Sequence, residues 1–487
     1  MIGAMHHLIS RLLAAGLCAA LAGAAPTVIL NGQAPPSAAA TKPAAAVTPA
    51  RPAALDPATL QKKLDELLEA HVRMNDFSGS VLLASGGKPL VAKGYGHANR
   101  EWEIPNTPQT KFRIGSITKQ FTSMLIMQLR EQGKLRLEDS VCEFVSPCPE
   151  TWKPVTIHHL LTHTSGIPTY TGLAAWREVN MAPKTVDQII AFFRDLPLQW
   201  TPGAKYAYNN SGYFLLGVVI EKAAGKKYEQ ALDDMILRPL GMKDTGYDWS
   251  RTIIPRRASG YSGRGPALAN AAALDMQQPF SAGAMYSTVE DLLTWDQALY
   301  TEKLLPEAAK TIMWTPVLSN YGYGWQIAEP GPQTFGYRRV AHGGGINGFS
   351  AMIVRVPEPR VTAIVLANND TANAGAIARD LLAIYYGQPY KVPAPRTVAN
   401  VDPSLFDGYV GKYQLGPNFV VTMTREGDRL MSQATGQGKF ELFPESDTTF
   451  FAKVTELTVQ FVRGADGKVT HFILHQGGRE QVAKRIE

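Results

Sequence analysis

The sequence predicts an α/β (α+β) protein: an antiparallel sheet flanked by helices with an all-helical insertion, followed by a small C-terminal antiparallel β-barrel. Strand patterns occur near both ends of one long unit, at 78–84, 90–95, 351–356 and 361–366. Helical periodicity dominates between these two groups of strands, so one sheet built from both ends of the unit, with the helices inserted, explains the order. After residue 409, short runs of alternating apolar and polar residues predict roughly six to eight further strands.

The first 24 residues have the pattern of a signal peptide. Arg11 precedes an apolar run at 12–22, and small residues at 22–24 provide a cleavage site. The run is too short to cross a bilayer and no later stretch is long enough, so we expect no stable membrane span. Leu17 stands before Cys18 where a lipid anchor requires a small residue. We therefore expect an exported protein, periplasmic or secreted.

Residues 25–55 consist largely of Ala, Pro and Thr and predict a linker, because this composition is unable to bury a core. At 487 residues the chain is too long for one ordinary domain. We expect a first folded unit at 56–392 and a β domain at 400–487, with Pro393 and Pro395 marking the boundary.

The first unit begins and ends with predicted helices. Asp56 and Pro57 are typical of a helix start, and the residues that follow place leucines on one face: Leu60, Leu64, Leu67 and Leu68. The helix predicted at 374–386 closes the unit.

The formal net charge of +6 is spread along the chain without a run of Lys and Arg. Nucleic-acid binding usually requires a basic patch or stripe, so we predict no nucleic-acid partner. The sequence contains no pattern that indicates an oligomeric state.

Two cysteines remain after removal of a signal peptide. Cys142 and Cys148 are six residues apart. In an oxidising compartment a local disulfide is favoured over a metal pair, because no second pair of ligands has a matching spacing.

Ser116 and Lys119 form a Ser-x-x-Lys pattern where a loop runs into a helix. Apolar residues at three- and four-residue intervals predict the buried face of that helix. Residues three apart share a helical face, so a hydroxyl would lie beside an amine at the positive end of the helix dipole. A neighbouring lysine with a lowered pKa is able to activate a serine. Surface helices also produce Ser-x-x-Lys by chance, so its companions decide the interpretation.

Tyr208 and Asn210 are two residues apart in an aromatic segment. Such a pair is able to relay a proton through the phenol and hold a substrate carbonyl with the amide. Taken alone, the same pattern also fits aromatic packing beside a turn.

A glycine-rich segment, 340–349, contains His342, Gly344 and Gly345. Glycines allow a backbone N–H to come close to a ligand, as an oxyanion hole requires. The letters also match a dinucleotide-binding fingerprint, but a strand rather than a helix is predicted next. We therefore expect no dinucleotide and no other cofactor.

His159 and His163 are four residues apart, which raises the possibility of a metal site. No Glu follows His159 in the arrangement used by metalloproteases, and no cluster of carboxylates lies nearby in the sequence. A structural turn containing a hydrogen-bonded histidine is favoured, and we predict no metal.

Taken together and in this order, the motifs resemble the serine β-lactamase and penicillin-binding-protein superfamily. The similarity is to the class C-like branch, which contains DD-peptidases, D-aminopeptidases and esterases. It covers about residues 77–387 and rests on five segments: 112–119, 160–167, 202–210, 282–292 and 342–345. The segment from 409 to 413 resembles the start of the lipocalin-like domain often appended to these enzymes. The resemblance implies a β-lactamase/transpeptidase-like fold and an acyl-enzyme mechanism.

The resemblance also implies a role for each site residue. Ser116 would be the nucleophile, Lys119 its base and Tyr208 the group that passes the proton to the leaving group. Asn210 would orient the substrate. The oxyanion hole would be formed by backbone N–H groups of Ser116 and Gly345, with Gly344 beside them and His342 on the third side.

His342 stands where similar β-lactamases carry lysine. Histidine is mostly neutral at pH 7, whereas lysine is a fixed positive charge suited to a β-lactam or terminal carboxylate. We therefore predict an exported serine hydrolase that cleaves small esters or amides and peptides containing D-amino acids. The alternatives are a true β-lactamase acting on β-lactam substrates and a non-catalytic cell-wall or partner-binding protein.

Overall fold

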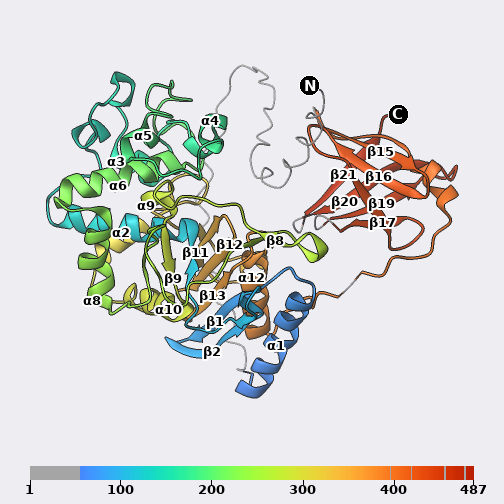
Figure 1. Cartoon of the computed structure of the whole chain (residues 1–487), viewed down its shortest axis with the longest axis horizontal. Helices are drawn as coiled ribbons and strands as arrows, with labels where there is room; N and C mark the ends of the chain where they lie inside the picture. Colours follow the sequence, from blue (N-terminus) through green and yellow to red (C-terminus); the bar gives the residue numbers. More distant parts are fainter. Residues whose placement is uncertain (1–54, 395, 418, 454–456, 477–478) are drawn as a thin grey trace, which may run out of the picture. The chain divides into compact units, whose positions relative to one another are not determined.

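The computed structural model describes residues 55–394, 396–417, 419–453, 457–476 and 479–487 (Figure 1). The predicted signal peptide and all of the predicted linker except Leu55 lie outside these residues. The described chain forms two compact units that meet in sequence at Ala394 and Pro395. Each unit is described by itself.

The first unit is built around a six-stranded antiparallel sheet with the order β10-β11-β12-β13-β1-β2. Its strands are β1 (Gly79–Ser85), β2 (Lys88–Tyr95), β10 (Gln326–Ala328), β11 (Arg339–Ile346), β12 (Phe349–Val356) and β13 (Val361–Ala367). The pairing of β1 with β13 joins the two ends of the unit across the whole length of both strands. The prediction of one sheet made from both ends is therefore confirmed.

The β1–β2 hairpin begins its second strand earlier than predicted. Gly86 and Gly87 both have positive φ, 57° and 78°, which is the backbone of a two-residue type I′ turn. Because the turn is this tight, Lys88 and Pro89 already belong to β2. Proline is tolerated there because β2 is an edge strand and needs no donor on its outer side.

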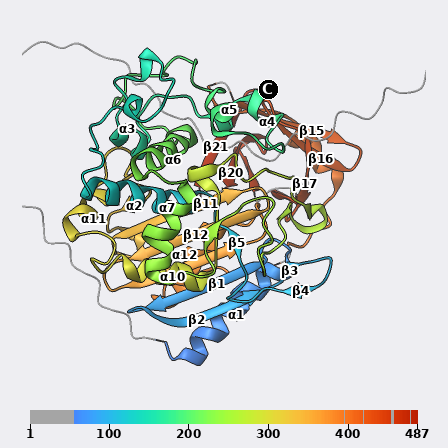
Figure 2. The same cartoon turned by 60° about the vertical axis from the view of Figure 1, so that its left-hand side comes forward.

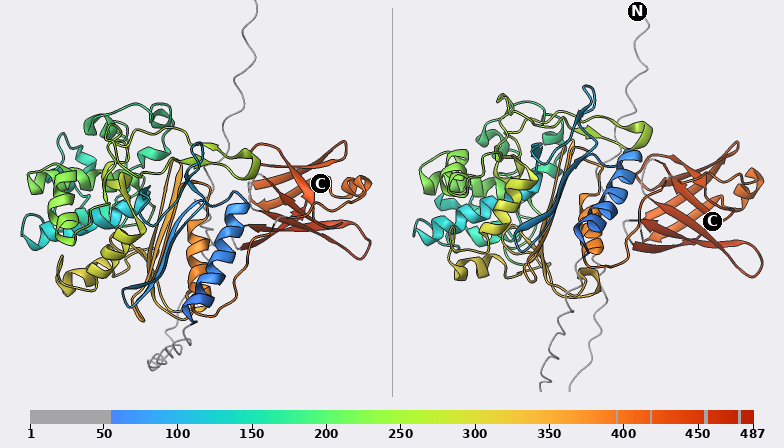
Figure 3. Two further views of the ribbon diagram at one scale, coloured as in Figure 1. Left: turned by 60° about the horizontal axis from the view of Figure 1, so that its bottom comes forward. Right: turned by 90° about the horizontal axis from the view of Figure 1, so that it is seen from below.

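Two helices cover one face of the sheet, and Figure 3 shows them side by side with the sheet between them and the rest of the helices. They are α1 (Pro57–Arg73) and α12 (Ala374–Tyr385). The Asp56 carboxylate accepts a hydrogen bond from Thr59 N at 3.0 Å and so caps α1. All four leucines of the predicted face of α1 are buried.

The opposite face carries the helical insertion and its short strands (Figure 2). Its helices are α2 (Thr118–Glu131), α3 (Ile157–Leu161), α4 (Ala174–Arg177), α5 (Val186–Ile190), α6 (Asn210–Ala224), α7 (Tyr228–Leu232), α8 (Arg238–Leu240), α9 (Phe280–Gly283), α10 (Val289–Ala298) and α11 (Glu307–Met313). The short strands are β3 (His97–Asn99), β4 (Ile104–Pro105), β5 (Phe112–Arg113), β6 (Gly246–Tyr247), β7 (Tyr261–Ser262), β8 (Ala269–Asn270) and β9 (Met285–Ser287). Helix α2 lies at the centre and contacts α6 and α9.

Helix α2 is buried on almost every side, including its polar positions. The sequence predicted one buried face, and its apolar members are indeed fully buried: Ile117, Phe121, Met124, Leu125 and Leu129. The other sides are buried because α6, α7, α9 and α11 surround the helix. A helix enclosed in this way holds its first turn, and hence Lys119, in a fixed position.

The predicted disulfide is present between Cys142 and Cys148. No helix among the described residues is both long and apolar enough to cross a bilayer.

The second unit is a closed antiparallel barrel of eight strands in sequential order, which confirms the predicted C-terminal β-barrel. Its strands are β14 (Gly411–Gly416), β15 (Phe419–Glu426), β16 (Arg429–Ala434), β17 (Phe440–Pro444), β18 (Thr449–Ala452), β19 (Thr458–Arg463), β20 (Val469–Gln476) and β21 (Arg479–Arg485). Aromatic rings fill the core, with Tyr409 stacked on Phe461 at 4.2 Å and Tyr413 packed on Phe472 at 5.0 Å.

Candidate active site

Ser116 lies on a short 3₁₀ turn, Gly115–Ile117, that leads directly into α2. The side chain of Lys119 comes from the first turn of α2, and its Nζ lies 3.0 Å from Ser116 Oγ. Ser116 is half-buried, whereas Lys119 is fully buried. The Ser-x-x-Lys pattern therefore produces the contact that its spacing predicts.

Three oxygen atoms surround the Lys119 amine. Besides Ser116 Oγ, Nζ donates to Asn210 Oδ1 at 2.9 Å and to the Ala282 carbonyl at 2.8 Å. No carboxylate is among these partners, and burial lowers the pKa of Lys119 well below its usual 10.5. A neutral amine has two N–H groups and one lone pair. Because the amide and carbonyl oxygens only accept, the lone pair is left for the Ser116 hydroxyl proton.

Tyr208 lies over the lysine, with its ring centroid 4.9 Å from Lys119 Nζ. The residue is 38% exposed overall, whereas its hydroxyl is buried near Ser116. Burial of the hydroxyl raises the pKa of Tyr208 above its usual 10, and hydrogen bonding to Ser116 opposes that shift only in part. At neutral pH the phenol is therefore protonated and able to donate.

Asn210 is the first residue of α6 and is held from several directions. Its Nδ2 donates to Thr171 Oγ1 at 3.0 Å, and its backbone N donates to Thr169 Oγ1 at 3.1 Å. The Thr171 contact orients the amide so that Oδ1 faces Lys119. The preceding residue, Asn209, caps α6 by accepting from Gly212 N at 2.9 Å.

The glycine segment forms the exposed end of β11, and two glycines permit its close approach to the serine turn. A Cβ on Gly344 would lie 1.9 Å from the Ile114 carbonyl oxygen and 3.2 Å from Ser116 N. A Cβ on Gly115, which has a φ of +49°, would lie 2.9 Å from Gly345 N. Side chains at either position would push the two backbones apart.

Gly345 presents its backbone at a free edge of the sheet. Strand β10 pairs with β11 only as far as Ala341, and the β11–β12 hairpin closes on the pair Ile346 and Phe349. In an antiparallel hairpin, alternate residues direct their N–H groups away from the partner strand. This alternation directs Gly345 N–H away from β12, toward the edge where Ser116 lies. Gly345 is also exposed, as an oxyanion donor must be.

His342 lies on the same strand but is buried, and its two ring nitrogens are both engaged. Nδ1 lies 2.6 Å from the Gly343 carbonyl oxygen, and Nε2 lies 2.9 Å from the Tyr321 hydroxyl. Because a carbonyl only accepts, Nδ1 carries the proton and Nε2 accepts from Tyr321. Burial, reinforced by Lys119, lowers the pKa of His342 to about 4. The imidazole is therefore neutral at pH 7.

His159 and His163, the histidines spaced four residues apart, each accept a hydrogen bond from a backbone N–H. No group of three or more His, Cys, Asp or Glu side chains in the described part of the chain has metal-binding geometry. His159 Nδ1 accepts from Thr156 N and caps α3, whereas His163 Nδ1 accepts from Asn209 N at 3.0 Å. The His163 ring packs against Tyr208 at 4.4 Å. His163 thus supports the segment that carries the candidate tyrosine.

Sequence reasoning did not single out Tyr321, Thr171 or the Ala282 carbonyl, all of which hold site residues. Tyr321 lies in a loop between α11 and β10, and Thr171 lies between α3 and α4. Neither has a motif around it. The Ala282 carbonyl belongs to a segment of the resemblance, but a backbone oxygen leaves no mark in a sequence.

The fold, together with a serine beside a buried lysine and a tyrosine, defines a protein of the serine β-lactamase and penicillin-binding-protein class of hydrolases. Residues 64–387 match the family model described as Beta-lactamase, and residues 395–485 match a domain of unknown function, DUF3471. The chain therefore belongs to the Beta-lactamase family.

Several known proteins are similar over most of the chain. A penicillin-binding protein of Bacillus subtilis (strain 168) is 32% identical over 455 residues, which cover 88% of this chain and 99% of that protein. The octameric penicillin-binding protein homologue from Pyrococcus abyssi is 27% identical with a TM-score of 0.62, covering 88% of this chain and 100% of that one. A D-stereospecific amidohydrolase from Streptomyces sp. is 26% identical with a TM-score of 0.58, covering 69% and 100%.

Proposed function

We propose that this protein is an exported serine hydrolase that forms an acyl-enzyme on Ser116 and cleaves small esters or D-amino-acid-containing amides and peptides. The observation that carries the proposal is the contact between Ser116 Oγ and the buried Lys119 amine at 3.0 Å. The two other partners of that amine accept hydrogen bonds only, so its lone pair is available to the serine. The D-stereospecific amidohydrolase among the similar structures supports amides of D-amino acids as the substrate class.

In the proposed reaction Lys119 takes the proton of Ser116 Oγ as the oxygen attacks the substrate carbonyl. The backbone N–H groups of Ser116 and Gly345 stabilise the resulting oxyanion. Tyr208 donates its hydroxyl proton to the leaving atom and recovers a proton from the Lys119 ammonium. Water then attacks the acyl-enzyme by the reverse path and releases Ser116. Lys119, rather than Tyr208, is the resting base, because burial lowers the pKa of the amine and raises that of the phenol.

The neutral His342 favours substrates whose leaving group carries no carboxylate. A β-lactam or a C-terminal D-alanine places a carboxylate near this wall, and a fixed cation there stabilises it. Here burial keeps the imidazole neutral at pH 7. Esters and amides whose leaving group carries no carboxylate need no cation at this position. They are therefore proposed ahead of β-lactams.

A covalent label tests the nucleophile. A fluorophosphonate should add its mass to the intact wild-type protein, and the adduct should map to Ser116. Ser116→Ala should abolish labelling, whereas Ser123→Ala, a buried serine of the same helix bonded to Tyr213, should still react. A folded wild-type protein that is not labelled would support a non-catalytic binding protein instead.

A substrate panel tests the reaction class. It should contain p-nitrophenyl esters, D-aminoacyl amides, D-Ala-terminated peptides and a chromogenic cephalosporin. Esters or D-aminoacyl amides should be turned over fastest. A cephalosporin hydrolysed faster than all of them would identify a β-lactamase. Export is tested separately, by N-terminal sequencing of protein recovered from the periplasm or medium.

A further inference from the structure

A cavity of about 330 Å³ lies at the β11–β12 turn and is lined by two arginines. Arg113 comes from β5, three residues before Ser116, and Arg257 comes from the loop before β7. The wall is completed by Asn270 and Ala271 of the β8 segment and by Asn347 of the β11–β12 turn.

The charges around this cavity are unbalanced. Arg113 Nε donates to Asp248 Oδ2 at 2.7 Å and Arg257 Nη1 donates to Asp248 Oδ1 at 2.5 Å. Asp248 is fully buried behind the two guanidinium groups, which are 16% and 28% exposed. One carboxylate therefore serves two arginines, each with five N–H donors. No acidic residue lines the cavity itself, so a net positive charge and several donors remain for another acceptor.

The cavity lies at the end of β11 toward which the acyl part of the substrate would extend. Tyr208, the proposed donor to the leaving group, packs on His342 with ring centroids 6.2 Å apart. The leaving group is thus placed at the His342 end of the free edge, and the carbonyl at Gly345. The acyl chain then extends the other way, toward Asn347. Asn347 lies in the β11–β12 turn, two residues after Gly345.

We propose that the cavity bounded by Arg113, Arg257 and Asn347 is an acyl-side subsite that binds a carboxylate carried by the acyl part of the substrate. This proposal rests on the acyl-enzyme function above and adds the substrate class. A ligand carboxylate completes a pairing of two guanidiniums with two carboxylates, and planar guanidinium groups bind carboxylates with good geometry. Acyl groups ending in a carboxylate, such as those of dicarboxylic half-esters or a D-glutamyl residue, are the expected occupants.

Two isosteric substrate pairs test the subsite. The p-nitrophenyl monoester of adipic acid is compared with the same ester bearing a terminal amide, and D-glutamyl p-nitroanilide is compared with D-glutaminyl p-nitroanilide. The measured quantity is the ratio of kcat/KM within each pair, which is independent of the fraction of enzyme that is correctly folded. We expect the wild type to prefer the carboxylate by roughly tenfold or more in at least one pair.

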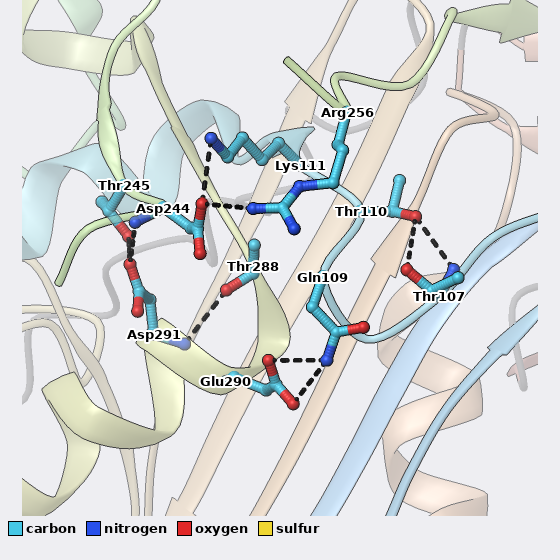
Figure 4. A network of polar contacts seen from close by, with 10 residues as sticks. All are labelled: Thr107, Gln109, Thr110, Lys111, Asp244, Thr245, Arg256, Thr288, Glu290 and Asp291. Carbon is cyan, nitrogen blue, oxygen red and sulfur yellow. Dashed lines mark hydrogen bonds and ion pairs between the residues drawn. The ribbon is translucent and has the colours of Figure 1, made fainter. Parts of the chain in front are cut away.

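Arg257→Gln should bring that ratio close to one, and Arg257→Lys should retain part of it. The matched control is Arg256→Gln, because Arg256 is the preceding residue but pairs with Asp244, which also contacts Lys111 (Figure 4). This control should keep the wild-type ratio. An equal rate for both members of each pair in the wild type, or an unchanged ratio in Arg257→Gln, overturns the subsite and leaves the hydrolase function intact. Loss of all turnover and labelling in the wild type would instead refute the hydrolase function.

Discussion

Tyr321 donates its hydroxyl hydrogen to His342 Nε2 at 2.9 Å, and this bond leaves the ring proton on Nδ1, which donates to the Gly343 carbonyl. Protonation of Nε2 would leave two donors facing each other unless the Tyr321 hydroxyl turned away. Because burial lowers the pKa of His342 to about 4, this histidine carries no charge at pH 7. A lysine at the same position would be a fixed positive charge.

Introducing a cation at this wall should change substrate preference. His342→Lys should raise acylation of Ser116 by penicillin by tenfold or more, because the ammonium attracts the β-lactam carboxylate. Turnover of neutral esters should fall at the same time. His342→Gln is the uncharged control and should not gain penicillin reactivity. Measurement of acylation rates by intact-protein mass spectrometry decides the matter, and equal rates in both variants would contradict the charge argument.

Stability should depend on pH through His342. Its pKa falls from 6.5 to about 4 on folding, so between these values the unfolded state binds a proton that the native state does not. Stability is therefore fully present above pH 6.5 and is lost as the pH falls toward 4. Between pH 7 and pH 5 the group should cost the native state about 2 kcal/mol. Urea unfolding at both pH values should show this loss in the wild type and a smaller loss in His342→Gln.

Activity should depend on pH through Lys119. The proton acceptor must be neutral, so kcat/KM should rise with pH through a pKa well below 10.5. Lys119→Arg should lower kcat/KM at least a thousandfold, since a guanidinium is unable to accept the proton. Lys111→Arg is the matched control, because Lys111 is also buried but pairs with Asp244 at 3.0 Å (Figure 4). A pH profile that Lys119→Arg leaves unchanged would reject Lys119 as the base.

The close approach of β11 to the serine turn predicts unequal effects for two adjacent glycines. Gly344→Ala should lower acylation by about a hundredfold or more, since its Cβ would meet the Ile114 carbonyl oxygen and displace the oxyanion donors. Gly345→Ala should be far less damaging, because open space surrounds the position where its Cβ would lie. Rates of labelling at Ser116 in the two variants provide the comparison. Equal losses would show that the approach of the two backbones is not the constraint.

Most of the fold could be predicted from local patterns. The strands β1, β12 and β13 and the helix α12 lie within one or two residues of their predicted limits, and α1 begins where it was predicted, because each buries a regular apolar face. The start of β2 was predicted too late, since the two glycines make a tighter turn than their neighbours suggested. The burial of the polar positions of α2 was not predicted, because elements distant in the sequence enclose them.

By itself the sequence determined the antiparallel sheet built from two distant ends, the eight-stranded barrel within its predicted range, the disulfide, and the adjacency of Ser116 and Lys119. These follow from periodicity and short spacing, which are local properties of a chain. Only the tertiary structure decided which three oxygen atoms surround the Lys119 amine, that His342 is neutral, and that Arg113 and Arg257 share one buried carboxylate. Those properties depend on burial and on hydrogen-bond partners supplied by loops far away in the sequence. Burial makes the charged form of a side chain unfavourable, and the sequence does not reveal which side chains are buried in this way.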